Sequence, residues 1–587
     1  MKELYQEVIR INQMADDARK ADRARSFFDT LNHMALPSQF NWADQIFEGI
    51  HVAAHPDKTA LVWHDIQTGE TREYSYLTLM HKANQLVNFL SENGVGHHQN
   101  MYMMAPIVPE MWVAGLACIK AGIVAVPTAT TMTPREMEYR FETYRPDVVL
   151  ADEASAEFID QAAEQTGVHP KVKLVLGSRP GWTGFDEIST RSVEAAAAPT
   201  RSDDILFCFF TSGTTGLPKR VGHTAVSYPV GHLSTTVIIG VQPDDIHHNL
   251  SAPGWAKWSW SSFFVPFNVG ATVTAFAYTA LDPALYLKAL ETKQVTTFCA
   301  PPTAWRMFVN SDLDGIDLTG LRQSVSAGEP LNPDVINRWE KYTGTRIRDF
   351  YGQTESTAMI GNPPWMKDKM RSGSFGVPAF MYDVALADDE GNEIHTPDTV
   401  GHIVVKLDNW RGTGLFKEYI GNPEKMSSVF VDNFYYTGDR ASFDVDGYWW
   451  FVGRADDVIK SSDFRIGPFE VESALIEHPA VAEAAVVGAP DPHRYQLVKA
   501  YVILNPNFEG NRDLALELFK HTTHILAKFK IPRIIEFVTE VPKTISGKIR
   551  RIELREMTAS KSDTAANSRF KEYFYWDFPE LSSKKKR

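Results

Sequence analysis

The segment from about residue 205 to 360 alternates short β-like runs with helical runs that carry their own start signals. Residues 272–278 read as a strand, Asp282-Pro283 then caps and starts a helix, and residues 296–300 read as the next strand. The same order repeats further along, with a helix that begins at Asn332-Pro333. Repeated β-α-β units predict a parallel sheet covered by helices, whose ligands bind at the carboxyl ends of the strands.

A loop rich in hydroxyls and glycines follows the apolar run 205–210, where one predicted strand ends. Glycine lets backbone N–H groups approach an anion, hydroxyls donate hydrogen bonds, and Lys219 can neutralise part of a polyphosphate. The loop is not a Walker A motif, because Leu217 and Pro218 separate Gly216 from Lys219. An ordinary Gly/Ser/Thr turn is the alternative. As a phosphate-binding loop it would use Thr211, Ser212, Gly213, Thr214, Thr215, Gly216 and Lys219.

The chain is too long, at 587 residues, for a single hydrophobic core. We predict a large domain over residues 1–454, a small α+β domain over 455–558, and a largely flexible basic tail over 559–587. The small domain is expected to contain helices at about 468–478 and 513–528, with strands between them. Aromatic residues in the tail are suited to dock on the body of the protein.

Charge and hydropathy exclude several functional classes. The 59 basic and 73 acidic residues give a net charge of −14, which argues against a general nucleic-acid binder. The three cysteines are widely spaced in apolar sequence, so we expect buried reduced thiols rather than disulfides or a zinc site. Residues 1–25 read as a solvated charged helix and not as a signal peptide. These features of the amino terminus predict a cytoplasmic protein. Because Lys120 and Pro127 interrupt the apolar stretch 111–128, we expect a core helix leading into a strand and no membrane span.

Six short segments, taken together and in order, resemble the motifs of the adenylate-forming superfamily, which includes acyl-CoA synthetases, firefly luciferase and peptide-synthetase adenylation domains. They are residues 211–219, 328–330, 351–355, 436–439, 453–457 and 542–548. The resemblance extends over about residues 40–557 and is closest to the medium-chain acyl-CoA synthetase group. It implies an α/β fold, in which a large multi-sheet N-terminal domain with parallel β-α-β layers is joined by a hinge to a small α+β domain.

The resemblance also implies a two-step reaction. A carboxylate attacks the α-phosphorus of ATP to give an acyl-adenylate and pyrophosphate, and the thiol of coenzyme A then displaces AMP. Glu355 would bind Mg²⁺, Thr354 would donate to the α-phosphate, and Lys548 would stabilise the charge that develops during adenylation. Taken alone, Glu355 could be a solvated loop carboxylate and Lys548 a surface lysine in a Ser-Gly-Lys turn.

The remaining nucleotide contacts follow from the same resemblance. Asp439 matches the carboxylate that accepts both ribose hydroxyls, although an Asp after Gly438 also suits a plain turn. Adenine would lie between the 328–330 backbone and the ring of Tyr351, which could otherwise be a core aromatic. The full set of expected contacts adds Gly328, Glu329, Pro330, Asp349, Gly352, Gln353 and Arg454 to the loop residues, Thr354 and Asp439.

Asp456 matches the hinge about which the small domain of such enzymes rotates between two poses. The second pose presents a loop to the tunnel for the pantetheine arm of coenzyme A, here Ser462, Asp463, Phe464 and Arg465. Many relatives have glycine where this chain has Asp463. A carboxylate there could narrow the tunnel or repel anionic coenzyme A, yet we expect coenzyme A to be the acceptor.

The acyl pocket is expected at Trp255, Lys257 and Gly352. Acetate-specific relatives have tryptophan at the position of Gly352, so glycine predicts room for a medium-chain, branched or aryl acid. The tryptophans of residues 254–260 could instead be core side chains, and Lys257 could face either the substrate or solvent. The expected activity is an ATP-dependent acid–CoA ligase acting on small molecules, as a monomer or homodimer. A ligase for a carrier protein, or for another acceptor, and a catalytically silent nucleotide or acyl-CoA sensor are the alternatives.

Overall fold

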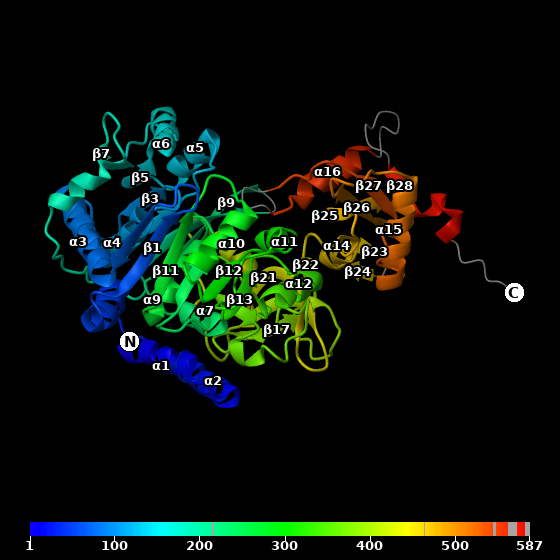
Figure 1. The fold of residues 1–587 in the computed structure, drawn as a ribbon, viewed down its shortest axis with the longest axis horizontal. Helices are drawn as coiled ribbons and strands as arrows, with labels where there is room; N and C mark the ends of the chain where they lie inside the picture. The colour runs from blue at the N-terminus through cyan, green and yellow to red at the C-terminus, as the bar shows by residue number, and fades with distance from the viewer. Residues whose placement is uncertain (214–215, 463, 544–547, 562–571, 582–587) are drawn as a thin grey trace. The chain divides into compact units, whose positions relative to one another are not determined.

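The computed structural model describes residues 1–213, 216–462, 464–543, 548–561 and 572–581 (Figure 1). The chain forms two compact units. Unit 1 comprises residues 1–384 and 406–435, and unit 2 comprises residues 385–405 and 436–587. The prediction of an α/β protein with a large multi-sheet part and a smaller C-terminal part is confirmed. The hinge expected at Asp456 and the domain limits expected at 454/455 and 558/559 stay predictions.

The first sheet of unit 1 has nine strands in the order β16-β15-β14-β13-β12-β10-β11-β1-β2. The six central strands from β14 to β1 are parallel to one another. The strands are β1 Thr59–Asp65, β2 Thr71–Ser75, β10 Ile246–Asn249, β11 Thr272–Ala277, β12 Thr297–Ala300, β13 Gln323–Ala327, β14 Ile347–Gly352, β15 Ala358–Gly361 and β16 Val377–Pro378. The parallel sheet predicted from the repeated β-α-β units is therefore confirmed.

Helices α10, α11 and α12 (Pro283–Thr292, Pro302–Val309 and Pro333–Thr343) pack against this sheet in one apolar cluster. The predicted caps are present: the Asp282 carboxylate accepts from the N–H groups of Ala284 and Leu285, and Asn332 Oδ1 accepts from the N–H of Asp334. These caps fix where α10 begins after β11 and where α12 begins after β13.

The second sheet of unit 1 has eight strands in the order β19-β9-β8-β4-β3-β5-β6-β7. They are β3 Asn100–Met104, β4 Val124–Pro127, β5 Val148–Asp152, β6 Val172–Leu176, β7 Thr183–Gly184, β8 Ile205–Gly213, β9 Gly216–Thr224 and β19 Glu418–Tyr419. Strand β8 does not lead into a helix. It turns back into the antiparallel strand β9, with Thr211 opposite Lys219, so the loop at residues 211–219 is the tip of a β-hairpin.

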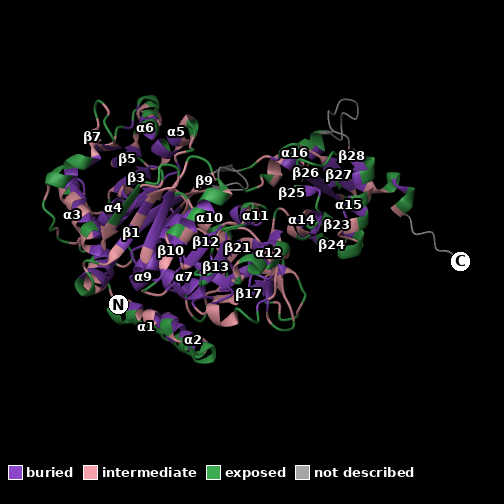
Figure 2. Cartoon of the chain, viewed as in Figure 1, coloured by how far each residue is buried: buried purple, intermediate pink, exposed green. Residues whose placement is uncertain are grey.

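Most residues on the central strands of both sheets of unit 1 are buried (Figure 2). Helix α4, Glu110–Ala121, is buried almost throughout and leads into β4, as predicted. No helix within the described ranges is both long and apolar enough to cross a membrane. The other helices of unit 1 are α1 Lys2–Gln13, α2 Asp17–His33, η1 Ala43–Val52, α3 Tyr76–Glu92, α5 Pro134–Thr143, α6 Glu153–Thr166, η2 Phe185–Thr190, α7 His232–Ile239, α8 Ala256–Trp258, η3 Ser259–Phe264, α9 Val265–Val269, η4 Pro364–Met366 and α13 Pro423–Val429.

The prediction of one solvated helix at the amino terminus is wrong. Two helices form there, and α1 buries Tyr5, Val8 and Ile11 completely. Their spacing of three residues puts these side chains on one face, and the surrounding charges hid this stripe in the composition. All three cysteines are free and buried, as predicted, and burial raises the pKa of Cys118 and of Cys208 to about 12.

Unit 2 contains two groups of strands. The first belongs to a five-stranded sheet of β17 Asp383–Ala387, β18 Gly401–Lys406, β20 Phe430–Val431, β21 Phe434–Phe443 and β22 Trp449–Arg454, of which β20 and the first residues of β17 and β21 fall in the range of unit 1. The second is a six-stranded sheet built from β23 Ile459–Ser461, β24 Phe464–Ile466, β25 Val481–Asp491, β26 Tyr495–Leu504, β27 Ile534–Phe537 and β28 Glu572–Phe574. Helices α14 Pro468–Ile476, α15 Arg512–Ile525 and α16 Arg551–Lys561 accompany it. The helices and strands expected for the small domain are thus present.

The tail contributes the last strand of this sheet. Strand β28 pairs antiparallel with β27, and Tyr573 and Phe578 pack into the apolar core of unit 2. An ionic cluster supports the pairing: buried Lys499 Nζ lies 2.8 Å from Glu536 and 2.5 Å from Glu572. The aromatic segment therefore docks, as expected, through both a strand and core contacts.

Candidate active site

The hairpin tip at residues 211–219 combines a buried hydroxyl with a nearby cation. Thr211 Oγ1 is buried and has no hydrogen-bond partner within the described part of the chain. Lys219 Nζ lies 5.3 Å from the ring centroid of Tyr419. Thr214 and Thr215 lie outside the described residues, as do the side chains of the segment 212–217. The adjacent Arg220, in the middle of β9, donates to the carbonyl of Thr143.

Strand β14 ends in the segment 351–355, where two residues outside the predicted motifs fix the backbone and a carboxylate. His223 on β9 is fully buried, and its Nε2 lies 2.7 Å from the carbonyl oxygen of Thr354. Burial lowers the pKa of His223 to about 3, so the ring stays neutral and Nε2–H donates to that carbonyl. The Tyr419 hydroxyl donates to Glu355 Oε1 at 2.8 Å. Neither His223 nor Tyr419 belongs to a motif that could be recognised in the sequence.

The carboxyl ends of β13 and β14 carry the residues predicted for adenine. The ring of Tyr351 is only partly buried and meets Phe375 edge-on at 5.6 Å. Asp349 is buried, and burial raises its pKa to about 8, above the usual range of a carboxyl group. Gly328 follows β13 with φ of +109°, a backbone conformation that favours glycine. Gln353 follows the end of β14, and its Oε1 accepts from the Tyr435 hydroxyl at 3.1 Å.

Lys257 does not extend into solvent. Its Nζ donates to the carbonyl of Ala327 at 3.2 Å, at the carboxyl end of β13. The role expected for Lys257 beside the substrate stays a prediction. Trp255, which precedes α8, is partly buried, whereas Trp258 and Trp260 are buried.

The space beside Gly352 is already filled. A Cβ atom at this position would lie 2.3 Å from the carbonyl oxygen of Thr357 and 2.8 Å from Cη2 of Trp260. The indole of Trp260 is held in place by its Nε1–H, which donates to the Tyr228 hydroxyl at 2.6 Å. The room that glycine leaves is therefore taken by a tryptophan from another segment, η3.

In unit 2, strands β21 and β22 pair so that Asp439 lies opposite Arg454. The Asp439 carboxylate is buried and lies 3.2 Å from Arg454 Nε, while its own N–H donates to Thr437 Oγ1. Asp456 follows in an exposed turn. The neighbouring Asp457 is paired instead, with Arg555 at 2.5 Å.

The remaining predicted residues of unit 2 lie at the turn into β24, on β24 itself, and in the segment before α16. Ser462 has φ of +53°, and its N–H donates to the carbonyl of Arg494. Phe464 stacks on Phe529 at 4.2 Å, and Arg465 is exposed. Asp463 lies outside the described residues, so its effect on a coenzyme A tunnel stays a prediction. Lys548 is exposed and follows residues 544–547, which are also outside the described ranges.

Comparison with known proteins identifies what this arrangement resembles. A family model described as AMP-binding enzyme matches residues 50–420, and a model described as AMP-binding enzyme C-terminal domain matches residues 470–548. The chain is 50% identical over 524 residues to 4-hydroxybutyrate–CoA ligase 1 of Metallosphaera sedula, covering 89% of this chain and 91% of the relative. It is 38% identical over 533 residues to the human mitochondrial acyl-coenzyme A synthetase ACSM3, covering 89% and 90%.

Solved structures show the same architecture. The crystal structure of the anthranilate CoA ligase AuaEII, in complex with anthranoyl-AMP, matches with a TM-score of 0.82 at 30% identity. That match covers 90% of this chain and 99% of the ligase. A benzoate CoA ligase from Burkholderia xenovorans matches with a TM-score of 0.77 at 27% identity, covering 88% of this chain and all of that one.

Proposed function

This chain belongs to the AMP-binding enzyme family, and on that premise we propose that it is an ATP-dependent acid–CoA ligase. It joins a carboxylic acid to AMP with release of pyrophosphate, and then transfers the acyl group to the thiol of coenzyme A. The observation that carries the proposal is the fixation of the segment 354–355. Neutral His223 holds the Thr354 carbonyl, and Tyr419 holds the Glu355 carboxylate.

Fixing this segment matters because the first step concentrates negative charge at the α-phosphorus. His223 fixes the backbone at Thr354 and Tyr419 fixes the Glu355 carboxylate, so this segment needs little reorganisation when that charge develops. The Glu355 carboxylate has acceptor capacity beyond the bond from Tyr419, and carboxylate oxygen is the ligand type that Mg²⁺ prefers, so the residue fits the proposed metal. A bound Mg²⁺ would offset phosphate charge. Thr354 would donate to the α-phosphate, and the hairpin with Lys219 would bind the outer phosphates.

Other residues take nucleotide-binding roles in the proposal. Tyr351 offers a partly exposed ring for stacking on adenine, and Asp349 a buried carboxyl for its amino group. Asp439 would accept the ribose hydroxyls, with Arg454 beside it to contact ribose or phosphate. Lys548 would stabilise the attacking carboxylate and the α-phosphate during adenylation. Asp456 would be the hinge.

The second step requires the acceptor thiol. Coenzyme A is supported as acceptor by relatives at 50% and 38% identity whose names are those of CoA ligases. The loop of Ser462, Asp463, Phe464 and Arg465 would border its pantetheine arm. A carrier protein as acceptor, or a silent sensor, remains the competing proposal. The buried reduced thiols suit the cytoplasm as compartment.

The acid in the proposal is a medium-chain, branched or aryl monocarboxylate. Its pocket would be bounded by Trp255, Lys257 and the pair formed by Gly352 and Trp260. Similar proteins are named for an aryl acid and for a short hydroxy acid, so both kinds belong among the acids to be tested.

A pyrophosphate-release screen tests the proposal. Straight, branched, aromatic, hydroxy and dicarboxylic acids would each be offered with ATP and Mg²⁺, with and without coenzyme A. Acid-dependent pyrophosphate release and a thioester product support the ligase. Pyrophosphate release without a thioester favours another acceptor, and no release with any acid favours a sensor. Tyr419→Phe should lower the rate with the best acid, whereas Tyr342→Phe, which alters an exposed tyrosine on α12, should not.

A further inference from the structure

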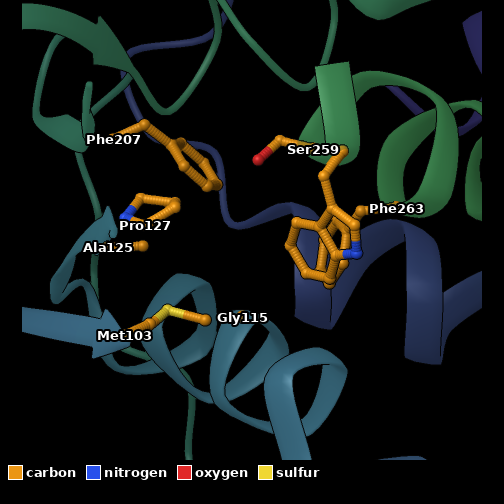
Figure 3. A pocket seen from close by; sticks show the side chains of 8 residues that line it. Met103, Gly115, Ala125, Pro127, Phe207, Ser259 and Phe263 are labelled. Carbon is orange, nitrogen blue, oxygen red and sulfur yellow. The ribbon is translucent and has the colours of Figure 1, made fainter. Parts of the chain in front are cut away.

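A small cavity lies in unit 1 beneath helix η3 (Figure 3). It has room for about one water-sized group. Its walls come from β3, α4, β4 and β8 on one side and from the α8–η3 segment on the other. The residues that line it are Met103, Gly115, Ala125, Pro127, Phe207, Trp258, Ser259 and Phe263. Apart from Trp258 and Ser259, the lining offers no polar side chain, and none of the eight is charged.

The hydroxyl of Ser259 points into this cavity, between Phe207 and Phe263 (Figure 3). The side chain is buried, with a relative exposure of 1%, and Oγ has no hydrogen-bond partner within the described residues. A buried hydroxyl without a partner is costly, and alanine would fill the same place without that cost. A serine at this position is therefore suited to a ligand that supplies the missing hydrogen bond.

Packing connects the cavity to the proposed reaction site. Phe207, which forms one wall, packs against the ring of Tyr228 at 5.4 Å. Tyr228 in turn packs against His223 at 4.1 Å, and His223 holds the Thr354 carbonyl. On the opposite side, Ser259 directly precedes Trp260, whose ring tip borders Gly352. Aromatic contacts thus connect the cavity to the backbone at Thr354 through Tyr228 and His223, and Trp260 connects it to Gly352.

We propose that Ser259 binds a hydroxyl group at the far end of the acyl chain, so that the preferred substrate is a short ω-hydroxy carboxylic acid. This inference rests on the proposed ligase function. A hydroxyl both donates and accepts, which matches the capacity of Ser259. A second carboxylate or an ammonium group is disfavoured, because no lining side chain carries an opposite charge. The small volume excludes a bulkier polar end such as an amide.

The test compares acids in pairs in which a terminal hydroxyl replaces a methyl group. The pairs are 4-hydroxybutyrate with valerate, 5-hydroxypentanoate with hexanoate, and 6-hydroxyhexanoate with heptanoate, measured as kcat/KM for pyrophosphate release. The wild-type protein should prefer the hydroxy acid by about tenfold at one chain length. Ser259→Ala should remove that preference while changing kcat/KM for the apolar partner little.

Ser262→Ala is the matched control, because Ser262 is also a buried hydroxyl on η3 but already accepts from Asn249 Nδ2 at 2.9 Å. It should leave the hydroxy preference unchanged. The inference is overturned if the wild-type protein prefers the apolar acid at every chain length. It is also overturned if Ser259→Ala lowers kcat/KM for both acids of a pair by the same factor, which is the result expected if Ser259 only binds a buried water. If no acid releases pyrophosphate, the ligase proposal itself fails; if turnover occurs without the Ser259 effect, only the inference fails.

Discussion

Trp260 should limit the length of the acid that the protein activates. Its indole occupies the space beside Gly352, 2.8 Å from where a Cβ atom of that residue would lie. Replacement by alanine removes the ring and leaves a space next to the proposed acyl site. If three methylenes of a longer acid fill that space at about 0.8 kcal/mol each, octanoate should gain about 2.4 kcal/mol, or roughly 60-fold in kcat/KM, relative to valerate.

The same change has a structural cost. Trp260 is 95% buried by side-chain packing and its Nε1–H donates to Tyr228, so Trp260→Ala should lower the free energy of unfolding by about 3–5 kcal/mol. Acid selectivity is therefore measured as the ratio of kcat/KM for octanoate to valerate, which a general loss of folded protein does not change. Trp260→Phe should give an intermediate ratio.

Trp305→Ala provides the control for destabilisation. Trp305 is completely buried on α11 and packs against Trp339 at 4.7 Å, within the cluster that covers the first sheet. Its loss should reduce activity on both acids by the same factor. If Trp260→Ala also lowers kcat/KM for octanoate and for valerate by the same factor, Trp260 is only a core residue and the reasoning about acid length is refuted.

Three further outcomes are expected. Lys548→Ala should slow pyrophosphate release by about 10²–10³, whereas Lys543→Ala, which removes only an ion pair with a glutamate on unit 2, should not. Burial lowers the pKa of His247 to about 3, so between pH 6.5 and 3 the unfolded chain binds a proton that the folded chain does not. As the pH is lowered through that range, the free energy of unfolding should decrease by about 1.4 kcal/mol per pH unit for each such histidine. In denaturant unfolding, His247→Gln should show a pH dependence of this free energy that is smaller by the contribution of one proton. Gly352→Ala should lower the melting temperature, because its methyl group would lie 2.3 Å from the carbonyl oxygen of Thr357; an unchanged melting temperature would contradict this.

The parts of the fold that the sequence predicted are those with local signals. Asp282 and Asn332 cap helices through their own side chains, so the β-α-β order of the first sheet could be read directly. The reversal of β8 into β9 could not be read, because the same glycines and hydroxyls suit a hairpin tip and a strand-to-helix loop.

The candidate site was predictable where a short motif contains the functional residues. The segment with Glu355 and the pair of Asp439 and Arg454 belong to such motifs. His223 and Trp260 do not, because each acts on a residue about a hundred positions away, and one sequence gives no signal for such contacts. Gly352 indicated an open pocket because the sequence does not show that Trp260 lies beside it.

The docked tail has a consequence for any shortened form of this protein. The C-terminal family model ends at residue 548, well before β28. A chain cut at that point would leave the backbone of β27 exposed along one side and would deprive buried Lys499 of one of its two carboxylates. Open sheet edges promote association between molecules. We therefore expect the solubility of unit 2 to depend on β28, a segment that lies outside the match to the C-terminal family model.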